Sequence, residues 1–189
     1  MITLNEVHVV VAENCSEPEG DFKREIRPMP LTVENLHKFW EKSRQFRTVF
    51  GDEVNGDFKK FCELFISMDD DDKLRAHGLF WVIDDFVGVF YLTNMTDVEA
   101  TCHYTFFDRR HLGREQLTRS MLRYVFDKFR FRRLNVEVPM YASKHTFGFT
   151  TALGFLKEGR KRKASFYKND WFDIAMFGLL REELENNGS

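Results

Sequence analysis

The stretch RRHLGREQLTRSMLRYVF, residues 109–126, lies between two segments that read as β-strands, and it decides the fold. The segment before it is EATCHYTFF at 99–107, and the segment after it is LNVEV at 134–138. Within and just beyond the stretch, apolar residues recur every four positions: Leu117, Met121, Val125 and Phe129. That spacing predicts one buried face of a helix. A strand, a helix and a second strand in a unit of this length predict a parallel crossover.

The residues on the N-terminal side of this unit predict an antiparallel meander. LFWVI at 79–83 and FVGVFYL at 86–92 flank Asp84 and Asp85, which is a hairpin signature. Together with 99–107 they would form three adjacent strands.

Still earlier, residues 24–32 alternate like a strand that ends at prolines, and Thr32 is placed to cap a helix. Two stripes at helical spacing follow: Leu36, Phe39 and Trp40, then Phe58, Phe61, Cys62 and Phe65. The acidic run at 69–72 predicts a solvated turn rather than a metal site, because no ordered ligand pattern follows it.

The C-terminal side predicts a helix and then a hairpin. The helix covers 146–152 and ends before Gly154, a natural terminator. The hairpin pairs 161–167 with 172–180 around a turn at 168–170. The sheet is therefore expected to be mixed, with helices packed on it.

Length and composition favour a single domain. The chain has 189 residues, 43% of them hydrophobic, which is enough for one core. We expect that domain to span 24–189, with residues 1–23 as an N-terminal extension that forms an extra strand or an arm. The net charge of −2 gives no global electrostatic reason to expect nucleic-acid binding.

Cysteine and histidine usage predicts a cytoplasmic protein without a metal. Cys15, Cys62 and Cys102 are far apart and odd in number, which fits a reducing compartment better than a disulfide framework. The first residues lack the basic region of a secretory signal, and no apolar run approaches the roughly 18 residues that span a bilayer. No histidine or cysteine pair has metal-ligand spacing.

The start of the 109–126 stretch has the order of an anion site: a strand, a tight loop and a helix start. Gly113 allows close backbone approach, and Arg110 and Arg114 can add charge-assisted contacts to a phosphate. The alternative is a basic amphipathic helix docked on a sheet, with a glycine before it.

The chain also resembles the GNAT N-acetyltransferases, in their RimJ/RimL-like branch. RHLGRE at 110–115 is similar to the family's Arg/Gln-x-x-Gly-x-Gly/Ala loop. Further similar segments follow the family's order, with one strand before the loop and four segments after it: EIRPMPL at 25–31, YVFDKFRFRRL at 124–134, LGFLKEG at 153–159, NDWFD at 169–173 and FGLLREE at 177–183. The resemblance covers residues 24–183 and implies an α/β (α+β) fold, with a mixed, mostly antiparallel sheet of about six to seven strands and helices on both faces.

The resemblance implies acetyl-CoA as cosubstrate and no metal. The residues it assigns to CoA binding surround the helix start, with one near a later helix: Phe107, Arg110, His111, Leu112, Gly113, Arg114, Glu115 and Ser143. Glu115 stands where the family has glycine or alanine. A carboxylate there opposes a polyanion unless it points away or pairs with Arg114 or Arg119.

Two residues are candidates for acid–base chemistry by the same resemblance. Glu137 would remove the amine proton; the alternative is a charge partner for an arginine on a neighbouring strand. Thr146 would donate to the leaving thiolate; the alternative is a hydroxyl that caps a helix. Tyr141 and His103 are reserve candidates, and a lone histidine such as His103 is more often a satisfied structural residue.

The leading interpretation is therefore an N-acetyltransferase that acts on a protein N-terminus, a lysine or a small amine as a monomer or homodimer, without a membrane partner. The alternative is a catalytically weak GNAT-fold module that binds acyl-CoA or a protein. A third interpretation, nucleic-acid binding by the basic residues around 109–133 and 157–163, is disfavoured by the overall charge.

Overall fold

The computed structural model describes residues 25–46, 49–51, 54, 56–70, 74–108 and 113–186. The expected N-terminal extension, together with Arg110, His111 and Leu112, lies outside the described residues.

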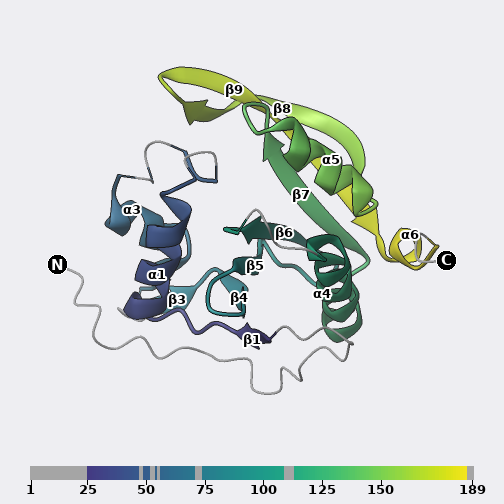
Figure 1. Ribbon diagram of the computed structural model, residues 1–189, viewed down its shortest axis with the longest axis horizontal. Coiled ribbons are helices and arrows are strands. Elements are labelled where there is room, and N and C mark those ends of the chain that lie inside the picture. The colour runs from purple at the N-terminus through teal and green to yellow at the C-terminus, as the bar shows by residue number, and fades with distance from the viewer. Residues whose placement is uncertain are drawn as a thin grey trace.

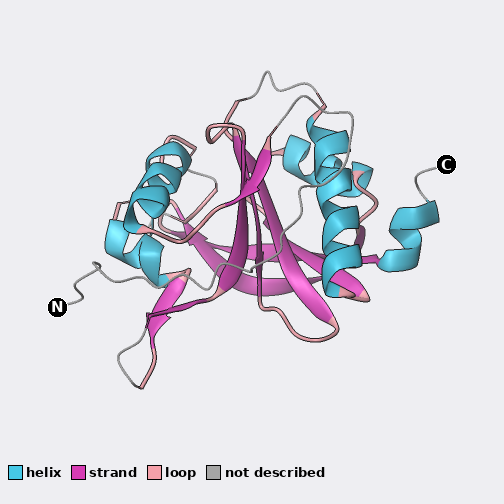
Figure 2. Ribbon diagram, turned by 90° about the horizontal axis from the view of Figure 1, so that it is seen from below, coloured by secondary structure: helices cyan, strands magenta, loops and turns pink. Residues whose placement is uncertain are grey.

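The centre of the fold is a seven-stranded sheet, which confirms the predicted mixed sheet (Figures 1 and 2). Its strands, in spatial order, are β1 (Ile26–Pro28), β4 (Gly78–Ile83), β5 (Gly88–Thr93), β6 (Glu99–Phe106), β7 (Arg133–Pro139), β9 (Asp170–Leu180) and β8 (Leu156–Tyr167). Only the β6–β7 pair is parallel. That pair is the predicted crossover, because α4 (Arg114–Phe129) connects its two strands.

Helices cover both faces of the sheet, as Figure 2 shows. On one face lie α4 and α5 (Lys144–Ala152); on the other lie α1 (Val33–Ser43) and α3 (Phe58–Glu63). The short helix α6 (Arg181–Asn186) follows β9 directly. None of the helices in the described part of the chain is long and apolar enough to cross a membrane.

The core under α4 follows from two sequence periods. Along β7 every second residue is buried, and Leu134, Val136 and Val138 face the helix. Along α4 the predicted apolar face is buried at Leu117, Met121 and Val125, while Phe129 is half-buried. The intervening β7 residues, Glu137 among them, therefore face the opposite side of the sheet.

The core under α1 is aromatic. Phe39 is fully buried, and its ring centroid lies 5.3 Å from that of Phe61 and 5.9 Å from those of Phe65 and Tyr91. Such ring pairs stabilise a core by more than the burial of their apolar surface alone. Tyr91 belongs to β5, so this cluster fixes α1 and α3 against the middle of the sheet.

Several predicted boundaries are confirmed. The Thr32 side chain accepts a hydrogen bond from the Asn35 amide at 3.2 Å, so Thr32 is the N-cap of α1. Gly154 has a φ of 102°, a left-handed conformation that ends α5 as predicted. In the β8–β9 turn, Lys168 and Asn169 also have positive φ, as tight hairpins require.

One expectation differs from the structure. The strand expected over 24–32 is limited to β1, because Pro28 and Pro30 have no amide hydrogen to donate. The described residues of the run expected as a solvated turn, Asp69 and Asp70, follow β2 (Ile66–Met68), which pairs with β3 (Leu74–Ala76) in a hairpin that was not predicted. Within that hairpin, Asp69 accepts a 2.8 Å hydrogen bond from Arg75.

Candidate active site

The candidate site is a cleft where two parallel strands separate. β6 and β7 are paired from Glu99–Arg133 to Thr101–Asn135 and have no ladder pairing beyond that point. A cavity of about 250 Å³ lies there, lined by residues 102–106 of β6 and 136–139 of β7. Ala142, Thr146 and Thr150 close it on the side of α5.

Glu137 and Thr146, the two residues with predicted chemical roles, both line this cleft. The Glu137 carboxylate forms an ion pair with Lys161 of β8, and its side chain is 34% exposed. The alternative role read from the sequence was a charge partner for an arginine on a neighbouring strand; the partner present is a lysine, on a strand that β9 separates from β7. A carboxylate that is paired and lines a cleft can serve either role.

Thr146 lies in the first turn of α5, beside the helix cap. Ser143 is the N-cap, and its Oγ accepts a 3.3 Å hydrogen bond from the Thr146 amide. The two hydroxyl oxygens are 3.2 Å apart, within hydrogen-bond distance. The capping role considered for Thr146 thus belongs to Ser143, which is exposed and does not line the cavity.

A tyrosine–threonine pair also lines the cleft, and sequence reasoning missed it. Thr150 donates its hydroxyl hydrogen to the Thr146 carbonyl at 3.0 Å, so it accepts from the Tyr104 hydroxyl at 2.7 Å. Burial raises the pKa of Tyr104, which keeps the phenol protonated. A proton-donating hydroxyl from β6 is therefore held against α5, across the cleft. The two residues are 46 positions apart, so no local pattern indicates the pair.

His103 is stacked on Tyr91 in the floor of the site. The ring centroids are 4.3 Å apart at an interplanar angle of 6°, and Nε2 lies 2.9 Å from the Thr93 hydroxyl. Burial lowers the pKa of His103 to about 4, so the imidazole is neutral at neutral pH. This agrees with the expectation that His103 is a satisfied histidine.

Acid is expected to destabilise the fold through His103. Its pKa of about 4 in the folded state lies below the unfolded value of about 6.5, so the folded state binds fewer protons. The stabilisation is complete above the unfolded pKa and is lost as the pH falls through the folded one. Because the ring is partly exposed, we expect a loss of about 1–2 kcal/mol between pH 7 and pH 4.5.

Urea unfolding of the protein and of His103→Gln at those two pH values measures this loss. The variant is expected to lose less stability than the parent protein; equal losses would show that other groups carry the acid response.

The start of α4 has the features of an anion site. Gly113 is its N-cap with a φ of 80°, and as a glycine it has no side chain to cap the first-turn amides. The Glu115 carboxylate accepts hydrogen bonds from Arg119, both at 3.3 Å. Arg119 also donates to the carbonyls of Ala152 and Leu153, so Glu115 is held beside a fixed cation. The Arg114 guanidinium lies 5.5 Å from the centre of the Phe149 ring.

Two other candidates lie apart from the cleft. The Phe107 ring packs toward α1, with its centroid 6.2 Å from that of Phe39. Tyr141 accepts a 3.3 Å hydrogen bond from the Ser165 hydroxyl and stacks on Tyr167 at 4.4 Å. In the described part of the chain, no cluster of three or more His, Cys, Asp or Glu side chains is arranged to hold a metal ion.

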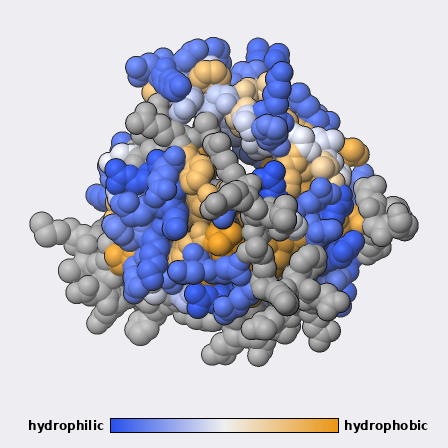
Figure 3. Space-filling view, viewed as in Figure 1, coloured by the Kyte–Doolittle hydropathy of each residue, from blue (hydrophilic) through white to orange (hydrophobic). Residues whose placement is uncertain are grey.

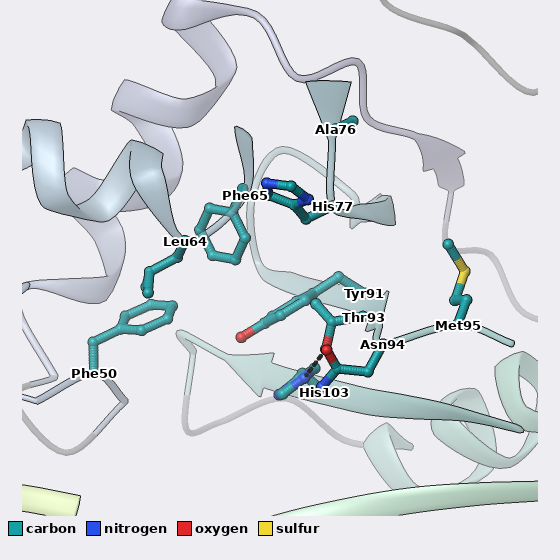
Figure 4. Close-up of a pocket in the computed structure, with 10 residues that line it drawn as sticks. All are labelled: Phe50, Leu64, Phe65, Ala76, His77, Tyr91, Thr93, Asn94, Met95 and His103. Atoms are coloured by element: carbon teal, nitrogen blue, oxygen red, sulfur yellow. Dashed lines mark hydrogen bonds between the residues drawn. The ribbon is translucent and has the colours of Figure 1, made fainter. Parts of the chain in front are cut away.

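A larger cavity of about 620 Å³ adjoins the cleft on the face that carries α1 and α3. Figure 4 shows its walls: Phe50, Leu64 and Phe65 on one side, His77 above, and Tyr91, Thr93 and His103 below. In Figure 3, apolar surface is visible between the hydrophilic surfaces of α1 and α4. Sequence reasoning did not predict this cavity.

Comparison with known proteins gives no match to any protein-family model. Over 67 residues the chain is 34% identical to YokL, a prophage-derived uncharacterized N-acetyltransferase of Bacillus subtilis (strain 168). That match covers 35% of this chain, and it spans only 37% of the relative's length.

Solved structures resemble the whole fold. A ribosomal-protein-S5-alanine acetyltransferase from Vibrio fischeri aligns with a TM-score of 0.61 and 13% identity, over 87% of this chain and 97% of that one. A spermidine N-acetyltransferase from Vibrio cholerae, solved with CoA and spermine, aligns with a TM-score of 0.67 and 14% identity, over 86% and 98%. The chain therefore has the fold of the GNAT acetyltransferases, which confirms the predicted fold class.

Proposed function

We propose that this chain is an acetyl-CoA-dependent N-acetyltransferase of the RimJ/RimL-like type, with a primary amine as acceptor. The observation that carries the proposal is the cleft between β6 and β7, whose wall combines a carboxylate with several hydroxyl groups, among them those of Tyr104, Thr146 and Thr150.

Acetyl transfer needs a base on one side and a proton donor on the other. A primary amine of pKa ~10 is protonated at neutral pH and must lose that proton before it can attack. Its nitrogen then forms a bond to the thioester carbonyl carbon, and the carbon–sulfur bond breaks to release a thiolate. Glu137 is the proposed proton acceptor, acting through water. Thr146 is the proposed donor to the thiolate, beside the Tyr104–Thr150 pair.

The start of α4 fits the pyrophosphate of CoA. The left-handed Gly113 offers no side-chain cap to the first-turn amides, and the Glu115 carboxylate is turned to Arg119. Those amides and the helix dipole favour an anion, and the Arg119 contact removes the objection that Glu115 raised. We assign phosphate binding to 110–115, of which Arg110, His111 and Leu112 lie outside the described residues.

Gly113→Ala is expected to weaken acetyl-CoA binding about tenfold, because a Cβ at positive φ is strained and stands where a phosphate must approach. The unliganded fold should lose only about 1 kcal/mol. Isothermal calorimetry with acetyl-CoA measures the affinity. The control is Gly148→Ala on α5, where an added Cβ meets nothing within 4 Å. Equal affinities in the two variants would contradict the assignment.

The function itself is tested in two steps. Acetyl-CoA, but not acetate, should raise the unfolding temperature, because a ligand that binds only the folded state stabilises it. Thiol release with a panel of peptide and small-molecule amines should then show turnover. An unfolding temperature that acetyl-CoA does not raise would contradict the proposal.

A second candidate function is a GNAT-fold module that binds acyl-CoA without efficient catalysis. The observation that favours it is the Glu137–Lys161 ion pair, which occupies the proposed base. Stabilisation by acetyl-CoA without thiol release from any amine would support this candidate.

Ion pairs of several basic residues weaken the case for nucleic-acid binding. Arg119 pairs with Glu115, Arg133 with Glu158 and Arg160 with Asp173. Paired cations have less charge to offer a phosphate backbone.

A further inference from the structure

We propose that the 620 Å³ cavity is the acceptor pocket and that it selects a primary amine carried on an uncharged aromatic or apolar body. This inference rests on the proposed acetyltransferase function and goes beyond it by naming the substrate class.

The first argument is the position of the cavity beside the cleft. The stacked rings of Tyr91 and His103 line both cavities, so the two cavities share this wall. A molecule that fills the larger cavity therefore lies next to the inner part of the cleft, where the proposed acetyl transfer takes place. A separate pocket elsewhere on the surface would not have this relation to the two strands.

The second argument is the chemistry of the walls. Phe50 and Phe65 present rings, and Leu64 and Met95 add exposed apolar side chains. Phe65 and Tyr91 meet edge to face with centroids 5.6 Å apart, so the aromatic surface continues onto the sheet. Rings of this kind bind a flat apolar group both by burial and by edge-to-face contact.

The third argument is the charge. Among the described residues that line the cavity there is no Asp or Glu; its polar side chains are Thr93, Asn94, His77, His103 and the Tyr91 hydroxyl. A polyamine would bring in a second ammonium group without a carboxylate among the described lining residues to pair with it, and burying an unpaired charge is costly. An amine with one ionisable group avoids that cost.

The fourth argument is size. Small-molecule sites occupy about 300–1,000 Å³, and this cavity of about 620 Å³ lies inside that range. Phenethylamine, or the first residue of a peptide that begins with phenylalanine, matches the pocket in both size and polarity.

The test compares three acceptors by thiol release: phenethylamine, the peptide amide Phe-Gly-Gly-NH2 and spermidine. The variant is Leu64→Glu, which adds a carboxylate to the pocket at a residue that is 43% exposed, so the fold should tolerate it. The matched control is Met68→Glu, which is 42% exposed and does not line the pocket.

The parent protein should favour the aromatic acceptors at least tenfold over spermidine in kcat/KM. Leu64→Glu should lower that preference at least tenfold, and Met68→Glu should leave it within twofold. The kcat/KM values of phenethylamine and the peptide amide are also compared with each other. A difference above tenfold in favour of phenethylamine indicates a small natural amine, and one in favour of the peptide indicates a polypeptide.

Binding is measured separately from turnover. Saturation-transfer NMR should detect the aromatic protons of phenethylamine on the CoA-loaded protein, with a weaker signal in Leu64→Glu. Preference for spermidine, or equal behaviour of the two Glu variants, overturns the inference and leaves acetyl transfer intact. Phenethylamine binding that Leu64→Glu reduces, without turnover of any amine, supports the pocket and overturns the proposed function instead.

Discussion

Glu137→Gln is expected to lower kcat for acetyl transfer about 100-fold while acetyl-CoA affinity stays within twofold. General-base catalysis typically contributes about 10²–10⁴-fold, and the amide is almost isosteric but cannot take the amine proton. Glu137 lines the cleft on β7, apart from the α4 start to which phosphate binding is assigned. Steady-state kinetics at saturating acetyl-CoA, with calorimetry for the affinity, measures both quantities.

The ion pair with Lys161 supplies the control, because a purely structural Glu137 would act only through that lysine. Lys161→Met frees the carboxylate and should leave kcat unchanged or raise it. If Glu137 only neutralises Lys161, the double variant Glu137→Gln/Lys161→Met should recover the activity that the single variant lost. If Glu137 is the base, the double variant stays about 100-fold slow. Recovery in the double variant would therefore remove Glu137 from the mechanism.

Phe39→Ala is expected to lower the free energy of unfolding by about 3–5 kcal/mol, which is the usual cost of truncating a fully buried phenylalanine. Phe39 has no exposed surface, and its ring meets those of Phe61, Phe65 and Tyr91. The cavity that this truncation leaves cannot close fully, because the Phe39 ring lies between a helix and a sheet. Urea denaturation at pH 7 measures the loss.

A phenylalanine outside the two cores is the matched control for this truncation. Phe166 on β8 is only half-buried, and its ring lies 5.2 Å from the exposed Trp171. Phe166→Ala should cost less than half of what Phe39→Ala costs. Equal losses in the free energy of unfolding would mean that the α1 cluster is no more tightly packed than the β8–β9 hairpin, which would contradict the prediction.

Local patterns predicted most of the sheet and the helices. The β4–β5 hairpin, the cap at Thr32 and the end of α5 at Gly154 each depend on residues within a few positions of one another. Such signals are complete within a short window of sequence. The β2–β3 hairpin was missed because three-residue strands are too short to display a period.

Two residues of the candidate site were predicted from the sequence, but the long-range contacts around them were not, for a physical reason. Glu137 and Thr146 were singled out by position in a family pattern, and the structure brings them to one cavity. Their partners depend on pairings across long stretches of chain: Lys161 reaches Glu137 from 24 positions away, and Tyr104 reaches Thr150 from 46. Register between distant segments is fixed by packing, which a single sequence does not display.

The divergence of β6 and β7 also determines what shape of ligand the sheet can accept. Beyond Thr101 and Asn135, the backbone edges that the two strands turn toward each other have no ladder partner in the described sheet. Each peptide hydrogen bond restored there is worth about 0.5–1.5 kcal/mol net. An extended molecule with amide groups of its own can lie in the gap and pair with either edge, as an added strand does in β-augmentation. The split sheet thus favours a thin, linear, amide-bearing ligand over a compact one.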